Sequence, residues 1–203
     1  MKKAAQPQPF SQLLSLWLGS DHPKTIGSLV AISPKKSFGL VFLVLMAVPA
    51  LPLPTGGITH ILEIIVMLLA AELIIGRRSI WLPDRWLQRP VGRSMQRRTI
   101  PYLIRRLTWL EGRSRPRAAA LMTSRFFQRL SGLIVLALAL SAFLAPPFSA
   151  LDTLPSLGVV IIALGMIVDD FLVWLIGLVI GLAGIGLIIG FGGLIVTAVR
   201  HIF

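Results

Sequence analysis

Two long apolar blocks constrain the fold of this chain more than any other feature. They cover residues 38–75 and 131–199, and a polar, arginine-rich stretch separates them. Of the 203 residues, 55% are hydrophobic, against roughly 45–50% in soluble domains. Because long apolar stretches are typical of segments that enter a bilayer, the sequence predicts an all-α polytopic membrane protein.

The positions of the basic residues predict the orientation of the chain. The net charge is +12, from 20 Lys and Arg against 8 Asp and Glu. Five lysines precede residue 37, fourteen arginines lie between Arg77 and Arg129, and only Arg200 lies beyond them. Because membrane proteins keep Lys and Arg on the cytoplasmic side, we expect the N-terminal segment 1–36 and the central segment 77–130 to be cytoplasmic.

The central segment contains a predicted surface-lying amphipathic helix. Thr99 and Pro101 form a helix start, and apolar residues recur at helical spacing up to Leu110. Such a basic helix beside membrane spans favours anionic phospholipids, at about 1 kcal/mol per Lys or Arg. The alternative is that the arginines only orient the spans. No nucleic-acid partner is expected, because no recognised motif is present. The candidate lipid contacts are Arg97, Arg98, Arg105 and Arg106.

The two apolar blocks resemble each other. Gly39 aligns with Gly132 and Pro54 with Pro147, and each block has a short apolar arm, a Pro-rich break and a longer apolar run. Both blocks begin beside positive charge, so the sequence predicts two parallel hairpin repeats, 37–76 and 131–171. Each is either a pair of short tilted spans or a re-entrant hairpin that turns at depth. The breaks contain Pro49, Pro52, Pro54, Gly56 and Gly57 in the first repeat, and Pro146, Pro147, Asp152 and Pro155 in the second.

Residues 172–199 are predicted to form a Gly-rich membrane helix, followed by the tail 200–203. Glycine allows helices to approach closely in lipid. The pairs Gly177/Gly181 and Gly186/Gly190 have the spacing of such contacts. They could pack within the chain or join two copies in a homodimer.

Five ionisable residues lie in or beside the apolar runs: His60, Glu63, Glu72, Asp169 and Asp170. Charged groups inside a bilayer are costly, so they tend to be paired or functional. His60 and Glu63 share one helix face and could form a proton relay or lie near headgroups. Glu72 could pair with Arg77 or Arg78, and each aspartate with a cytoplasmic arginine. The helix starts after the breaks could hold an anion such as a phosphate, or be ordinary caps.

Common catalytic and metal-binding patterns are missing from the sequence. There are no cysteines, and the three histidines show no metal-binding spacing. No motif for acyl, phosphoryl or glycosyl transfer is present either. We therefore expect a protein without enzymatic activity, cofactor or metal.

The order of the motifs resembles the ExoD-type exopolysaccharide synthesis family. The resemblance covers roughly residues 25–195 and is carried by SFGLVFLVLMAVPALPLPTGG (37–57), AELIIGRRSIWLPDRWL (71–87), LEGRSRPRAAAL (110–121) and LPSLGVVIIALGMIVDD (154–170). The residues that match the family motifs are Gly76, Arg77, Trp81, Leu82, Pro83, Arg115, Pro116 and Arg117. The chain departs from the family pattern at Glu72, at Asp169-Asp170 and at 150–153.

The resemblance implies a bacterial inner-membrane protein linked to polysaccharide production, and names a process rather than a reaction. We therefore expect a non-enzymatic assembly or lipid-interacting factor, as a homodimer, in contact with the bilayer and possible exopolysaccharide machinery. The alternative is a small transporter or channel with a substrate site at the two breaks.

Overall fold

The computed structural model describes residues 9–34, 36–52, 58–77, 79–81, 84–93, 95–113, 119–146 and 149–202. Within these ranges the chain is helical and forms no strand, apart from an isolated bridge between Thr25 and Pro90. The elements are α1 (Phe10–Gly19), α2 (Ile26–Ala31), α3 (Ser37–Met46), α4 (Ile58–Ile75), α5 (Asp84–Leu87), the π-helical turn η1 (Met95–Thr99), α6 (Ile100–Arg113), α7 (Ala119–Met122), α8 (Arg125–Leu144), α9 (Thr153–Val168) and α10 (Phe171–Ile202). The predicted all-α fold class is confirmed for the described residues.

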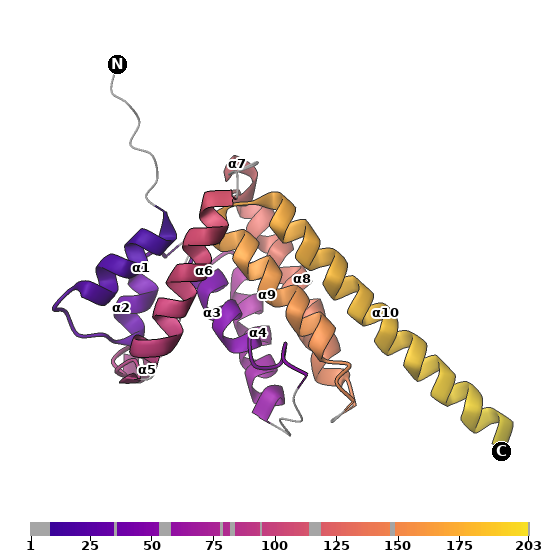
Figure 1. Cartoon of the computed structure of the whole chain (residues 1–203). Coiled ribbons are helices and arrows are strands. Elements are labelled where there is room, and N and C mark those ends of the chain that lie inside the picture. The colour runs from indigo at the N-terminus through magenta and orange to yellow at the C-terminus, as the bar shows by residue number, and fades with distance from the viewer. Residues whose placement is uncertain are drawn as a thin grey trace.

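Four helices, α3, α4, α8 and α9, form the central bundle. Helix α3 packs against α9 and α4 packs against α8, while α8 also contacts α9. In Figure 1, α3 and α8 run toward the lower end, and α4 and α9 return from it. The two hairpins therefore point the same way, and both of their turns lie at one end of the bundle, which we call the hairpin-turn end.

The two hairpins make matching contacts through a glycine. A Cβ atom on Gly39 would lie 3.0 Å from the Ala163 carbonyl oxygen and 3.1 Å from Ile167 Cγ1. A Cβ atom on Gly132 would lie 3.0 Å from the Ala70 carbonyl oxygen and 3.1 Å from Ile74 Cγ1. The spacing that separates Gly39 from Gly132 also separates Ala70 from Ala163 and Ile74 from Ile167. The glycines let the first arm of each hairpin approach the second arm of the other hairpin closely.

The opposite end of the bundle shows the same correspondence. Helix α4 is followed by Gly76 (φ 92°), and α9 is followed by Asp169 (φ 56°), so both end in a left-handed residue. Lys36, at the start of α3, forms an ion pair of 2.8 Å with Asp169. Arg129, near the start of α8, places its guanidinium beside Gly76. Asp169 was expected to pair with an arginine. It pairs instead with a lysine, because Lys36 lies at the start of α3, which packs along α9.

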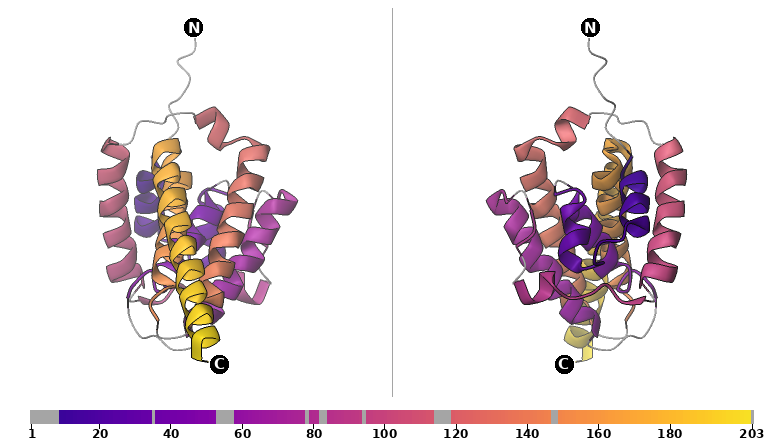
Figure 2. Two further views of the ribbon diagram at one scale, coloured as in Figure 1. Left: turned by 90° about the vertical axis from the view of Figure 1, so that its right-hand side faces the viewer. Right: turned by 90° about the vertical axis from the view of Figure 1, so that its left-hand side faces the viewer.

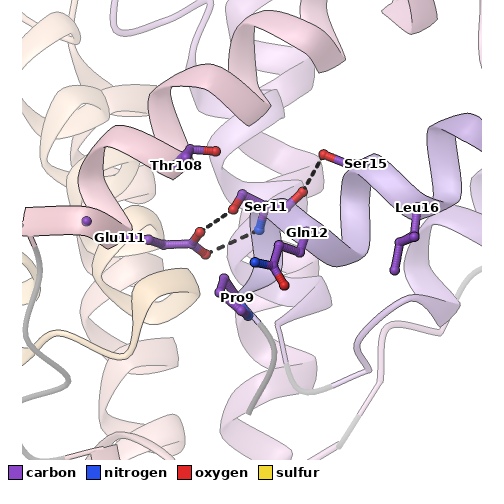
Figure 3. A pocket seen from close by; sticks show the side chains of 8 residues that line it. Pro9, Ser11, Gln12, Ser15, Leu16, Thr108 and Glu111 are labelled. Carbon is purple, nitrogen blue, oxygen red and sulfur yellow. Dashed lines mark hydrogen bonds between the residues drawn. The ribbon is translucent and has the colours of Figure 1, made fainter. Parts of the chain in front are cut away.

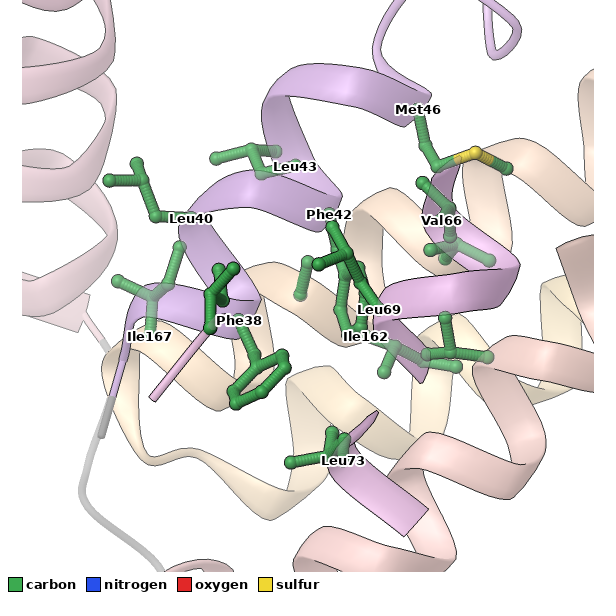
Figure 4. Close-up of a cluster of buried hydrophobic side chains, with 14 of the residues drawn as sticks. Phe38, Leu40, Phe42, Leu43, Met46, Val66, Leu69, Leu73, Ile162 and Ile167 are labelled. Atoms are coloured by element: carbon green, nitrogen blue, oxygen red, sulfur yellow. The ribbon is translucent and has the colours of Figure 1, made fainter. Parts of the chain in front are cut away.

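The bundle interior is filled with apolar side chains. Phe38 and Phe42 of α3 pack against Leu69 and Ile162, as Figure 4 shows. A buried aliphatic or aromatic side chain contributes about 1.5–3 kcal/mol relative to an exposed one. Burial of this interior therefore holds the two hairpins together.

The lengths of the helices indicate which of them could cross the hydrocarbon core of a membrane. Helix α3 has 10 residues, so it is about 15 Å long, against about 30 Å of hydrocarbon core. Among the described helices, two are long and apolar enough to cross a membrane, Arg125–Leu144 and Phe171–Gly190. The first arm of the first hairpin is too short to cross.

Glycines also bring α10 against the bundle. A Cβ on Gly177 would lie 2.5 Å from the Ile162 backbone nitrogen, and one on Gly158 would lie 2.6 Å from Gly181 Cα. Gly177 and Gly181 thus serve intramolecular packing of α10 on α9. By contrast, Gly186 and Gly190 have open space where a side chain would be, and α10 extends away from the bundle beyond them (Figure 1).

Helices α1, α2 and α6 form a separate flank of the molecule. Figure 2 shows α6 on one side and α4 with α8 on the other. Thr25 caps α2 through a reciprocal bond with Ser28. The apolar stripe of α6 packs inward: Ile100 and Leu107 are buried, and α1 packs on α6. An amphipathic pattern identifies an apolar face, and here another helix of the chain covers it.

Candidate functional site

A carboxylate lies inside the bundle at the hairpin-turn end. The buried face of α4 follows helical spacing through Thr59, Glu63, Val66 and Ala70. Glu63 is 0% exposed, although carboxylates are rarely fully buried without a partner. Glu63 is the ionisable member of an otherwise uncharged helix face.

His60 connects this carboxylate to the molecular surface. Its Nδ1 lies 2.9 Å from Glu63 Oε2, and its side chain is 30% exposed. The imidazole ring also meets the ring of Phe143 on α8 edge-on, with centroids 5.3 Å apart. The i, i+3 spacing read from the sequence therefore corresponds to a direct contact. Packing of α4 on α8 orients the imidazole.

The start of α9 adds further polar groups at this end. Asp152 precedes the helix, and its carboxylate makes no capping bond but acts electrostatically on Glu63. The expected capping role of its side chain is therefore wrong. Ser156 is fully buried, and the spacing that separates Gly39 from Gly132 also separates Glu63 from Ser156. That spacing is the signal by which sequence reasoning could have found Ser156.

Several of these polar atoms have no hydrogen-bond partner. Glu63 Oε1, Thr153 Oγ1 and Ser156 Oγ are the buried side-chain atoms without one among the described residues. An unpaired buried polar group costs about 1–3 kcal/mol. Because three such atoms lie at one end of the bundle, we take this end as the candidate site. We call its polar residues the turn-end cluster (His60, Glu63, Asp152, Thr153 and Ser156).

The charge of the turn-end cluster selects among ligands. Two carboxylates face this end, so it is unsuited to the phosphate or other anion that the helix starts could have held. In the part of the chain that the structure describes, no three His, Asp or Glu side chains converge as a metal-binding group. The cluster suits a positively charged or hydrogen-bond-donating ligand.

The predicted break residues differ in exposure. Pro49 is buried, Pro52 and Pro146 are exposed, and Pro155 is buried in the first turn of α9. Outside the described residues lie Pro54, Gly56, Gly57 and Pro147.

The other predicted acids lie at the opposite end of the bundle. Glu72 Oε2 accepts a hydrogen bond of 2.9 Å from the Trp81 backbone N–H, and Glu72 Oε1 lies 3.9 Å from Arg77. The Arg77 guanidinium also lies over the Trp81 ring. Gly76, Arg77 and Trp81 are thus brought together with Glu72, whereas Arg78, Leu82, Pro83, Arg115, Pro116 and Arg117 lie outside the described residues. Asp170 is buried and accepts a bond from the Leu172 backbone at the start of α10.

Helix α6 exposes a stripe of aromatic and basic residues. Tyr102 is 58% exposed with Arg106 over its ring, and Trp109 is 56% exposed with Arg113 over its ring. Arg97, Arg98, Arg105 and Arg106 are all exposed. These four predicted arginines therefore remain available on the outer face of the α6 region.

A pocket of about 550 Å³ lies between α1 and α6 (Figure 3). In it, Glu111 accepts hydrogen bonds from the Ser11 backbone N–H, at 3.2 Å, and from the Ser11 hydroxyl. The carboxylate thus satisfies the free backbone N–H of Ser11 at the start of α1. This contact joins two segments that are far apart in the sequence, and no sequence pattern indicated it. We assign it a structural role.

Comparison with known proteins identifies the family. The family model described as "Exopolysaccharide synthesis, ExoD" matches residues 11–190. The chain belongs to the ExoD family. It is 29% identical over 148 residues to the uncharacterized protein slr1875 of Synechocystis sp., a match that covers 73% of this chain and 69% of the relative. No solved structure matches. The resemblance read from the motifs is confirmed, and ExoD membership points to a role in exopolysaccharide synthesis.

Proposed function

We propose that this ExoD-family chain is a multi-pass protein of the bacterial inner membrane that supports exopolysaccharide synthesis or export without catalysing a reaction. The observation that carries this proposal is the pair of parallel hairpins with matching glycine contacts. A 10-residue α3 is shorter than about 30 Å of hydrocarbon, and this supports a re-entrant first hairpin. Helices α8 and α10 are long enough to cross. The matching contacts support a duplicated unit.

In this arrangement the Arg-rich segment and the N-terminal segment lie in the cytoplasm, as the excess of Lys and Arg favours. Gly186 and Gly190, where a Cβ would meet no atom within 4 Å, support a second copy of the chain as a partner. The α1–α6 flank offers the side on which exopolysaccharide machinery would be contacted.

A cysteine accessibility experiment tests the topology. Because the chain contains no cysteine, single replacements report without background. Gly112→Cys, on exposed α6, should react with a membrane-impermeant thiol reagent only from the cytoplasmic side. Leu51→Cys, at the turn of the first hairpin, should not react from the periplasmic side. Periplasmic labelling at 112 would reverse the orientation, and periplasmic labelling at 51 would show a full crossing. The proposed process is tested separately: the wild-type protein should restore the exopolysaccharide yield of cells whose copy of this protein has been deleted.

We further propose that α6 contacts anionic phospholipids. Exposed Trp and Tyr beside Arg are typical of the membrane interface. The double variant Arg105→Gln with Arg106→Gln should reduce the amount of phosphatidylglycerol that co-purifies with the protein in nanodiscs, since each arginine contributes about 1 kcal/mol. Added salt should reduce the difference between the wild type and this variant. The control is Arg93→Gln with Arg125→Gln, which removes the same charge elsewhere. Equal loss in both variants would assign the effect to net charge alone.

A second candidate function is transport of a small solute past the turn-end cluster. The observation that favours it is the group of unpartnered buried atoms, Glu63 Oε1, Thr153 Oγ1 and Ser156 Oγ. Intramembrane polar groups of this kind mark substrate or ion pathways. Uptake or efflux by proteoliposomes that contain the purified chain, compared with Glu63→Gln, tests this candidate.

A further inference from the structure

The burial of Glu63 requires either a positively charged partner or protonation of its carboxyl group. Burial of an ionised carboxylate without a partner carries a large cost in free energy. A buried carboxyl group is therefore either paired with a cation or neutral. Glu63 is fully buried, and its Oε1 has no hydrogen-bond partner. Only Oε2 is engaged, and it is engaged by a histidine.

Among the described residues, the elements around Glu63 bring no lysine or arginine to it. On α4 itself, His60 is the adjacent titratable group, and from the start of α9 Asp152 adds negative charge. Helix α3 and residues 171–190 of α10 contain no titratable side chain. The charged residues of α8, Arg125 and Arg129, lie at its other end. Among the described residues, His60 is therefore the group placed to bring a compensating proton to Glu63.

The geometry of His60 suits it to carry a proton. Histidine is the side chain whose charge changes near neutral pH. One ring nitrogen, Nδ1, is 2.9 Å from Glu63 Oε2, and the side chain is partly exposed at the surface. The contact with Phe143 on α8 holds the ring in this orientation. His60 therefore has one nitrogen on the buried carboxylate and a second that can exchange a proton at the surface.

We propose that His60 and Glu63 form a proton-binding site that loads from the hairpin-turn end and holds one proton inside the bundle. A hydronium ion gives a proton to His60 Nε2 and leaves as water. The imidazolium then gives its Nδ1 proton to Glu63 Oε2, so that His60 ends neutral and Glu63 ends as a carboxylic acid. The reverse steps release the proton. This proton-binding site goes beyond a role in exopolysaccharide synthesis. Its use to couple proton movement to solute transport rests on the second candidate function, transport past the turn-end cluster.

Infrared difference spectroscopy of the purified full-length protein tests this site directly. The spectrum between mildly acidic and alkaline pH should contain the carbonyl band of a buried protonated carboxyl group. Glu63→Gln, which keeps the shape of the side chain, should lose this band. The matched control is Glu72→Gln, on the same helix but at the opposite end of the bundle, which should keep it. A band unchanged in Glu63→Gln, or lost equally in Glu72→Gln, would overturn the proposal.

Two further measurements separate proton binding from a structural effect. In a pH-jump experiment with an indicator dye, wild-type protein should take up one proton more than Glu63→Gln, and His60→Gln should slow this uptake at least several-fold. The thermal midpoint of the wild type should fall with rising pH relative to Glu63→Gln, because alkaline pH ionises a carboxyl group in apolar surroundings. Identical proton counts would contradict the site. Unchanged exopolysaccharide yield in Glu63→Gln would leave the site intact and remove only its link to that role.

Discussion

Replacement of Gly177 by alanine is expected to separate α10 from α9 and to destabilise the fold by about 1–3 kcal/mol, the usual cost of overpacking. The added Cβ would lie 2.5 Å from the Ile162 backbone nitrogen and 2.8 Å from the Gly158 carbonyl oxygen. Backbone atoms cannot rotate away as a side chain can. The helices must therefore move apart along their contact. Thermal or denaturant unfolding in detergent measures the loss.

The matched control is Gly186→Ala on the same helix. At this position a Cβ meets no atom within 4 Å, so only the intrinsic preference remains. Alanine is better than glycine in a helix by about 1 kcal/mol, so this variant should be neutral or slightly stabilised. The two substitutions therefore have opposite expected signs. A loss at 186 as large as at 177 would show that Gly186 is also a packing contact, as in a dimer.

The sequence predicted local features of the fold where short-range physics decides them. Threonine is a preferred N-cap residue, and Thr25 caps α2 because its hydroxyl reaches the backbone of Ser28 within one turn. The first apolar arm ends at Met46, just before the Pro-rich break, since a proline cannot donate a helical hydrogen bond. The side chains of His60 and Glu63 also contact each other, as their i, i+3 spacing on one helix predicts.

The features that sequence reasoning missed depend on which helices meet. The stripe of α6 had a visible apolar face, but nothing in its pattern indicated that α1 would cover it. Asp169 had a visible charge, but its partner Lys36 lies at the start of a helix far away in the chain. Ser156 is unremarkable in its own segment and gains meaning only beside Glu63. Tertiary packing, rather than local preference, determines these contacts.

Alanine at Gly39 and alanine at Gly132 are expected to cost nearly the same free energy of unfolding. Each Cβ would lie 3.0 Å from a backbone carbonyl oxygen and 3.1 Å from an isoleucine Cγ1. Each variant should lose about 1–2 kcal/mol, toward the lower end of overpacking because the isoleucines can shift. Unfolding of the two single variants, measured side by side with Gly186→Ala as reference, gives both costs.

Equal costs would have a structural cause, because the two contacts join different helix pairs. Gly39 brings α3 onto α9, whereas Gly132 brings α8 onto α4. The double variant should lose about 2–4 kcal/mol if the two contacts are independent, and more if the hairpins separate together. A tolerated alanine at one position and a large loss at the other would contradict equivalent hairpins. Equal losses would support a duplicated unit that places Glu63 and Ser156 at corresponding positions of α4 and α9.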